Sequence, residues 1–74
     1  MVKITYTYSF VELSGKPKRF IEKLDECKIL GYGVSTDTVT LIVLFDSDES
    51  YDKLNKLLNQ KFKLKLKNKT IIYS

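Results

Sequence analysis

Five lysines occupy alternate positions near the C-terminal end of the chain: Lys61, Lys63, Lys65, Lys67 and Lys69. Successive side chains of a β-strand point to opposite faces, so this spacing predicts a strand with one cationic face and one apolar face. A row of ammonium groups can contact the phosphate oxygens of a nucleic-acid backbone. Lysines on an edge strand also prevent sheets from pairing edge to edge, so the pattern has a purely structural interpretation as well.

The residue types that most catalytic and metal sites require are absent or isolated. The chain has no histidine, so general acid–base catalysis would depend on carboxylates, tyrosines or lysines. Cys27 is the only cysteine, too few for a zinc site, and its spacing predicts a buried position on a helix. The three glycines do not form a phosphate-binding loop. We therefore expect a protein that is not an enzyme and that has no cofactor and no bound metal.

An acidic segment from Asp46 to Asp52 has the alternation that begins an EF-hand calcium loop. The match fails at loop positions six and twelve, where Tyr51 and Leu57 replace the required glycine and glutamate. Asp46 is followed three residues later by Glu49, which is typical of a capping box at a helix start. The segment therefore predicts a helix with Asp46 as its N-cap and no calcium site.

Length and charge restrict the class of protein. Seventy-four residues predict a single domain over 1–74, with a formal net charge of +4. No apolar run approaches the roughly 20 residues that cross a bilayer, and the first residues do not have the layout of a signal peptide. We expect a cytoplasmic protein with no membrane partner and no small-molecule substrate.

The first half of the chain predicts a strand and then a helix. Residues 2–11 alternate, with two sets on opposite faces: Val2, Ile4, Tyr6, Tyr8 and Phe10 inward, and Lys3, Thr5, Thr7 and Ser9 outward. Pro17 suits the first turn of a helix. Phe20, Leu24 and Cys27 then recur at helical spacing, and Gly31 is expected to cap or break that helix.

The second half predicts two strands, a helix and the lysine strand. Residues 35–38 have turn chemistry and divide the stretch 32–45 into a short edge strand and an apolar central strand. The helix that follows has an inward stripe: Tyr51, Leu54, Leu57, Leu58 and Phe62. The lysine strand either continues to the end or turns at residues 67–69 into a last strand over 70–73.

This order, β-α-β-β-α-β, is typical of the ferredoxin-like arrangement. We predict an α+β fold: a single small ferredoxin-like βαββαβ sandwich, whose antiparallel sheet has two helices on one face. Central first and third strands fit their apolar character, and an edge position for the fourth fits its lysines. A β-α-β-α-β layout, with residues 32–45 undivided, is the alternative.

The uncovered face of such a sheet is the predicted nucleic-acid site. It would combine lysines and hydroxyls from the first and fourth strands: Lys3, Thr5, Thr7, Lys63, Lys65 and Lys67. Ammonium and hydroxyl groups suit phosphate oxygens, whereas exposed aromatics that stack on bases are missing from the pattern. We therefore expect contact with the backbone of a nucleic acid without sequence reading.

A rival hypothesis assigns the same face to a protein partner. Thr40, Ile42 and Leu44 alternate outward on the third strand, and the two aliphatic residues would form an apolar spot among lysines. Small domains often complete their core by dimerising. The rival is a protein-interaction module, either a homodimer or a viral or plasmid-encoded binder of a host protein, that uses this spot and an edge strand.

Overall fold

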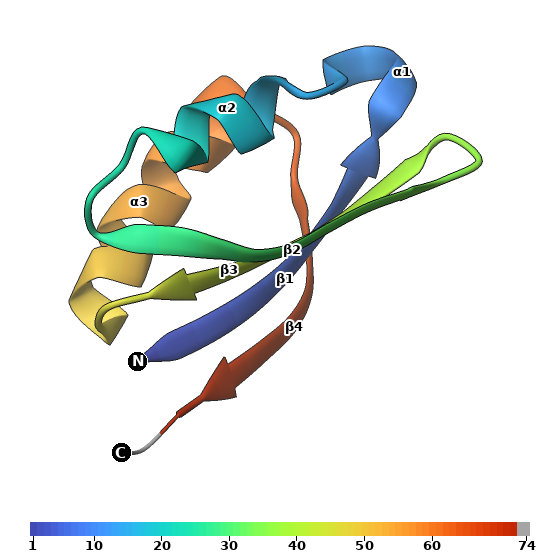
Figure 1. The fold of residues 1–74 in the computed structure, drawn as a ribbon. Coiled ribbons are helices and arrows are strands. Elements are labelled where there is room, and N and C mark those ends of the chain that lie inside the picture. Colours follow the sequence, from blue (N-terminus) through green and yellow to red (C-terminus); the bar gives the residue numbers. More distant parts are fainter. Residues whose placement is uncertain (73–74) are drawn as a thin grey trace.

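A four-stranded antiparallel sheet with helices on one face forms the protein in a computed structural model, which describes residues 1–72 (Figure 1). The elements in chain order are β1 (Val2–Ser9), α1 (Phe10–Leu13), α2 (Lys16–Glu22), β2 (Cys27–Ser35), β3 (Thr38–Phe45), α3 (Asp48–Lys61) and β4 (Lys65–Ile71). The strands lie in the order β2-β3-β1-β4. The predicted α+β class and antiparallel sheet are confirmed, with three helices in the described residues where two were predicted.

The two central strands supply most of the core. β1 and β3 pair antiparallel along their whole length, from Val2 opposite Phe45 to Ser9 opposite Thr38. Their inward side chains are buried as the alternation predicts: Val2, Ile4, Tyr6, Tyr8, Val39, Leu41, Val43 and Phe45. Burial of this apolar surface against α2 and α3 is the main stabilising contribution to the fold. We call this side of the sheet the helix face and the opposite side the open face.

The inward position predicted for Phe10 is wrong. The strand ends at Ser9, and Phe10 begins the short helix α1 with 39% of its surface exposed. Its N–H donates to the Asp37 carbonyl at 2.6 Å, which ties α1 to the turn between β2 and β3. Alternation of residue types continues past Ser9, so the sequence pattern alone does not indicate where the chain leaves the sheet.

The helix predicted to begin near Pro17 is shorter than expected. α2 begins near Pro17 as expected but ends at Glu22, so Cys27 and Gly31 lie on β2. Cys27 is buried, opposite Phe45, on a strand where a helix was predicted. Inward residues that follow the end of a helix can keep helical spacing by coincidence, which explains the error.

The division of residues 32–45 is confirmed, and the undivided alternative is wrong. Ser35 and Thr38 pair with each other, and Thr36 and Asp37 form the turn between β2 and β3. Thr36 has a φ of 59°, in the left-handed region that a β-branched residue rarely adopts. The β2–β3 hairpin extends beyond α2 and α3 at this end (Figure 1).

The N-cap of α3 is Ser47, one residue after the predicted Asp46. The Ser47 hydroxyl oxygen accepts from the Ser50 N–H at 3.1 Å. Asp46 instead donates its backbone N–H to the Glu26 carbonyl at 3.0 Å, which extends the sheet end. Tyr51, Leu54 and Leu58 are buried as predicted; Leu57 and Phe62 are half-buried against them.

Candidate nucleic-acid interface

The pairing of β1 with β4 places part of the predicted lysine row on the open face. Cross-strand partners share a face, and Thr7 pairs with Lys65. Lys3 likewise pairs with Thr70. The predicted neighbourhood of first-strand hydroxyls and fourth-strand lysine therefore exists at the Thr7–Lys65 position.

A β-bulge interrupts the predicted alternation. Tyr6 pairs with Leu66 but Thr5 pairs with Asn68, so Lys67 is an extra residue without a partner in the register. Beyond the bulge the faces exchange, and Lys69, opposite Ile4, lies on the helix face. The uninterrupted strand predicted from Lys61 to Lys69 is therefore wrong, because Lys61 also belongs to α3.

Lys69 interacts with the start of α3. Its Nζ lies 3.6 Å from an Asp48 carboxylate oxygen and 4.9 Å from the centre of the Tyr51 ring. Thr70 and Ile71 continue β4, so the single-strand alternative is confirmed as far as Ile71, and Tyr73 lies outside the described residues. The bulge thus divides the lysines of β4 between the two faces.

Lys63 lies in the connection before β4, where the prediction placed it within the strand. With Lys65 it lines a hollow of about 390 Å³ at one end of the sheet. Thr7 lines the same hollow, and so do two acidic residues, Glu12 and Asp37. Lys63 and Lys65 are thus brought together as predicted, but carboxylates share their surroundings.

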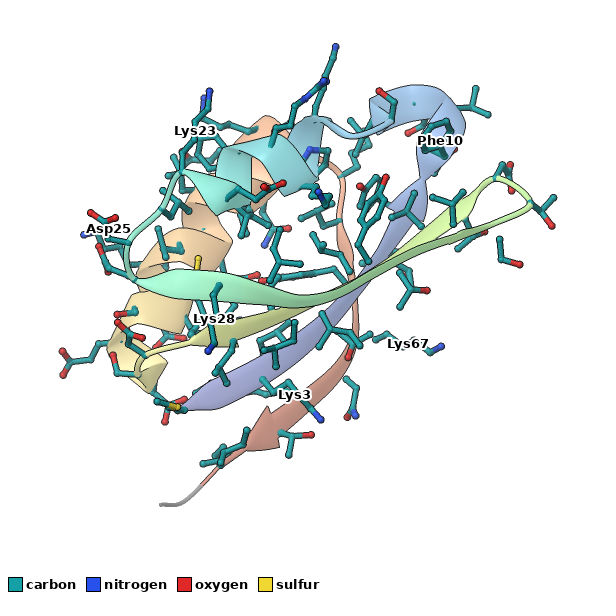
Figure 2. The ribbon with its side chains drawn as sticks, in the orientation of Figure 1. Lys3, Phe10, Lys23, Asp25, Lys28 and Lys67 are labelled. Carbon is teal, nitrogen blue, oxygen red and sulfur yellow. The ribbon has the colours of Figure 1, made fainter. Side chains whose placement is uncertain are left out.

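Lys28 joins the open face from the opposite edge, a position that the helix prediction for Cys27 missed. It pairs with Leu44, which in turn pairs with Lys3. Figure 2 shows the side chains of Lys3, Lys28 and Lys67 pointing away from α2 and α3. The alternation of Cys27, Lys28 and Ile29 was the available sequence signal, since the apolar residues flank the lysine as on a strand.

The open face is hydroxyl-rich and basic, and its paired positions include no acidic residue among the described residues. Those positions are Lys3, Thr5, Thr7, Ser9, Lys28, Gly31, Gly33, Ser35, Thr38, Thr40, Ile42, Leu44, Lys65, Asn68 and Thr70. Adjacent strands are about 4.8 Å apart, so Lys3 and Lys28, two strands apart, are separated by about 10 Å at their backbones. The cationic surface therefore spans the width of the sheet.

The predicted interface residues lie at the centre of the open face. Thr40, Ile42 and Leu44 are half-buried, and none of the helices covers them. A Cβ at Gly31 would come within 3.3 Å of Ile42 Cδ1, so the glycine leaves room for the isoleucine side chain. The apolar spot is small and continuous with the threonines of β1.

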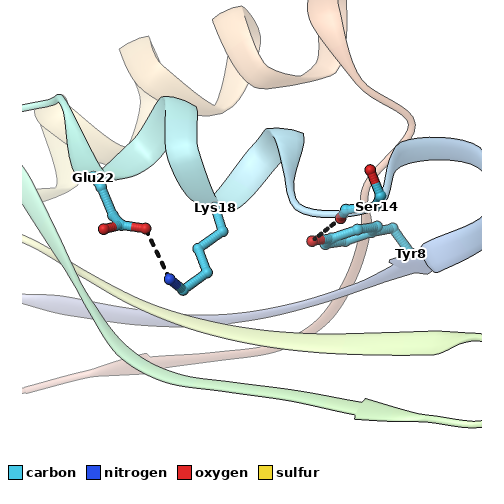
Figure 3. Close-up of polar contacts among 4 residues, drawn as sticks. All are labelled: Tyr8, Ser14, Lys18 and Glu22. Atoms are coloured by element: carbon cyan, nitrogen blue, oxygen red, sulfur yellow. Dashed lines mark hydrogen bonds and ion pairs between the residues drawn. The ribbon is translucent and has the colours of Figure 1, made fainter.

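The buried polar groups on the helix face have structural partners. Tyr6 donates to Asn55 Oδ1 at 2.9 Å, and Tyr8 donates to the Ser14 carbonyl at 3.1 Å, as Figure 3 shows for the second pair. Burial raises the pKa of Tyr8 to about 12 and the pKa of the Cys27 thiol to about 11. Both groups are therefore neutral near neutral pH, where a thiol with such a pKa is a weak nucleophile.

Within residues 1–72, no group of three or more Cys, Asp or Glu side chains is arranged to hold a metal ion, and no helix is long and apolar enough to cross a membrane. No family model, curated protein or solved structure matches the chain.

Proposed function

We propose that the protein binds the phosphate backbone of single-stranded nucleic acid across its open face. The observation that carries the proposal is the charge of this face: its paired positions hold Lys3, Lys28 and Lys65, Lys67 lies beside them, and no carboxylate is paired among them. Each lysine that contacts a phosphate releases condensed counterions, so such a surface gains affinity at low salt.

The shape of the open face suits an extended single strand of nucleic acid better than the groove of a duplex. In the part of the chain that the structure describes, the open face is formed by the sheet, and no helix projects from it to enter a major groove (Figure 2). Aromatic residues are missing from its paired positions, so stacking on bases, the usual source of affinity for unpaired bases, is not available there. Binding is therefore electrostatic, with little preference among base sequences.

The test is the salt dependence of binding to a short single-stranded oligonucleotide, measured by fluorescence anisotropy. Three to four phosphate contacts predict a slope of log affinity against log salt of roughly −2 to −3. The combined replacement of Lys3, Lys28, Lys65 and Lys67 by glutamine should remove most of that slope.

A matched control uses two lysines away from the face and is compared with Lys28→Gln/Lys65→Gln, which removes the same charge. Lys53 and Lys56 are exposed on α3, so the double variant Lys53→Gln/Lys56→Gln removes charge without touching the open face. Its slope should stay close to that of the wild type. Equal loss from both sets would mean that the protein binds through its net charge alone, and no binding at low salt would end the proposal.

The protein-interaction hypothesis is the second candidate. It is supported by the half-buried Ile42 and Leu44, whose apolar surface lies uncovered at the centre of the open face. Ile42→Lys separates the candidates, because it should abolish a protein contact made there while leaving or increasing affinity for an oligonucleotide.

We also propose the finer fold assignment and the cellular location. The ferredoxin-like arrangement is supported by the two helical connections, from β1 to β2 and from β3 to β4, each of which passes over a neighbouring strand. The extra helix α1 departs from the simple βαββαβ order. A cytoplasmic location remains a proposal that imaging of a tagged protein would test.

A further inference from the structure

Among residues 1–72, no strand pairs with the outer side of β2, and this edge of the sheet is almost uncharged. Lys28 is the only charged residue in its nine positions. Three apolar side chains of this edge are markedly exposed: Leu30 at 49%, Tyr32 at 37% and Val34 at 47%. A long apolar edge strand presents a row of free N–H and C=O groups, which favours pairing with a further strand.

A bulge gives this edge a self-complementary pattern. Leu30 has no partner in the register, since Ile29 pairs with Val43 and Gly31 pairs with Ile42. On either side of the bulge the helix-face positions are Cys27 and Ile29, then Tyr32 and Val34, while Lys28 and Gly33 are open-face positions. Reading β2 in the reverse direction through a point between Leu30 and Gly31 gives the same order of faces.

We propose that two copies of the chain pair antiparallel through β2 and form a continuous eight-stranded sheet. A twofold axis between Leu30 and Gly31 places Cys27 opposite Val34 of the second copy, and Ile29 opposite its Tyr32. Lys28 then lies opposite the second copy's Gly33. Each of these three pairs joins positions of one face, as antiparallel pairing requires.

Charge and space both favour a second copy as the partner strand. In this register the two Lys28 residues are about 17 Å apart along the strands, beyond the screening length of about 8 Å at physiological salt. No atom lies within 4 Å of a Cβ built at Gly33, so the opposing Lys28 has room. The other edge, β4, carries Lys65, Lys67 and Lys69 and would repel its own copy.

A hollow on the α2 side of β2 provides space for the incoming side chains. It has a volume of about 410 Å³ and is lined by Lys18, Glu22, Cys27, Lys28 and Ile29. Lys18 and Glu22, which line this hollow, form an ion pair 2.9 Å long. Figure 3 shows the ion pair. Val34 of the second copy would enter beside Cys27, so its exposed side chain becomes buried.

The pairing would also extend the open face. A twofold axis perpendicular to the sheet keeps the open faces of both copies on the same side, so the lysines of the two copies would form one longer surface. The dimer itself does not depend on nucleic-acid binding, and each can be tested without the other.

The first test is the mass of the protein in solution, by size exclusion with light scattering at high micromolar concentration. A dimer has twice the 8.6 kDa of the chain. Val34→Lys should give a folded monomer, because the lysine is exposed in the single chain but its charge would be buried between the two copies in the dimer. Leu66→Lys, at an exposed position on β4, is the control and should remain dimeric. A monomeric wild type, or a dimer that Val34→Lys leaves intact, would overturn the proposal.

A crosslink tests the register. Val34→Cys places a thiol opposite the native Cys27 of the second copy, so mild oxidation should give a covalent dimer on a non-reducing gel. Mass spectrometry should find positions 27 and 34 joined. Adding Cys27→Ser should abolish the crosslink, and Leu66→Cys on the opposite edge should form none beyond random collision. A crosslink that survives Cys27→Ser would exclude this register.

Discussion

The two edge strands of the sheet differ mainly in charge, since β4 also exposes large apolar side chains, Leu66 and Ile71. β4 places three lysines in seven positions, whereas β2 has a single lysine in nine and exposes three large apolar side chains. Both strands flank a shared centre of β1 and β3. Lysines on an edge discourage pairing with a further strand, so only β4 is protected in this way. The difference indicates that the molecule has one edge suited to association and one that resists it.

A bulge lies in each edge strand, with different consequences. In β4 the extra residue Lys67 sends Lys69 to the helix face, where it reaches Asp48 and Tyr51. In β2 the extra residue Leu30 makes the order of faces the same in both directions. The bulge in β4 therefore brings Lys69 into contact with α3, and the bulge in β2 gives that strand a symmetric order of faces.

The largest effect is expected at the centre that both edges share. Leu41 is fully buried on β3, so Leu41→Ala should lower the free energy of unfolding by about 2–5 kcal/mol, as cavities in cores do. Leu66→Ala, at a 53% exposed position on the edge, should cost less than about 1 kcal/mol. Urea unfolding followed by circular dichroism measures both. Equal losses in the two variants would show that the β4 edge contributes as much to the free energy of unfolding as the buried centre does.

Alkaline pH should lower the free energy of unfolding, in part because Cys27 is buried on β2 as a neutral thiol. The folded pKa of Cys27 is raised from 9.0 to about 11 by burial, so between these values the unfolded chain loses a proton that the folded chain keeps. The stabilising contribution is present below pH 9.0 and is lost as the pH rises toward 11. Burial raises the pKa of Tyr6 and Tyr8 in the same direction.

Unfolding free energies across this pH range provide the measurement. Cys27→Ser should make the decline with pH shallower, because one of the coupled protons is removed. An unchanged slope in that variant would mean that Cys27 does not contribute to the alkaline loss.

The Ser47 cap stabilises the first turn of α3, which includes the Asp48 that contacts Lys69 of β4. Ser47→Ala removes the acceptor for the Ser50 N–H and should cost about 0.5–2 kcal/mol. Asp46→Ala keeps the observed cap and should cost less than about 0.5 kcal/mol. The order of the two melting temperatures checks this assignment, and a larger loss at Asp46 would restore it as the cap.

One lysine variant at each edge of the sheet tests which path a bound oligonucleotide takes. If it crosses all four strands, Lys28→Gln and Lys67→Gln should each reduce the salt slope by about 0.7. If it follows β4 alone, only Lys67→Gln should do so. Anisotropy titrations at several salt concentrations distinguish the paths, and no effect from either variant would remove both lysines from the site.

The sequence predicted the centre of the sheet better than its edges. Alternation on β1 and β3 follows from burial of one face, so Ile4, Tyr6, Leu41 and Val43 were placed correctly. The edge strands have little burial to enforce a pattern, and one extra residue exchanges the faces of everything beyond it. Lys69 was assigned to the wrong face for this reason, whereas Lys28 was missed because its segment was predicted as a helix.

Lys69 provides the smallest and most specific test of the difference between the bulges. Its ammonium group meets the Asp48 carboxylate and the Tyr51 ring on the helix face, while Lys67 points away from the helices. An exposed ion pair contributes about 0–1 kcal/mol and is screened by salt, and an exposed cation–π contact contributes about 0.5–1 kcal/mol. Lys69→Gln should therefore lower the free energy of unfolding slightly, and Lys67→Gln should leave it unchanged. The opposite result, with Lys67 the more important for stability, would mean that the bulge does not send Lys69 to α3.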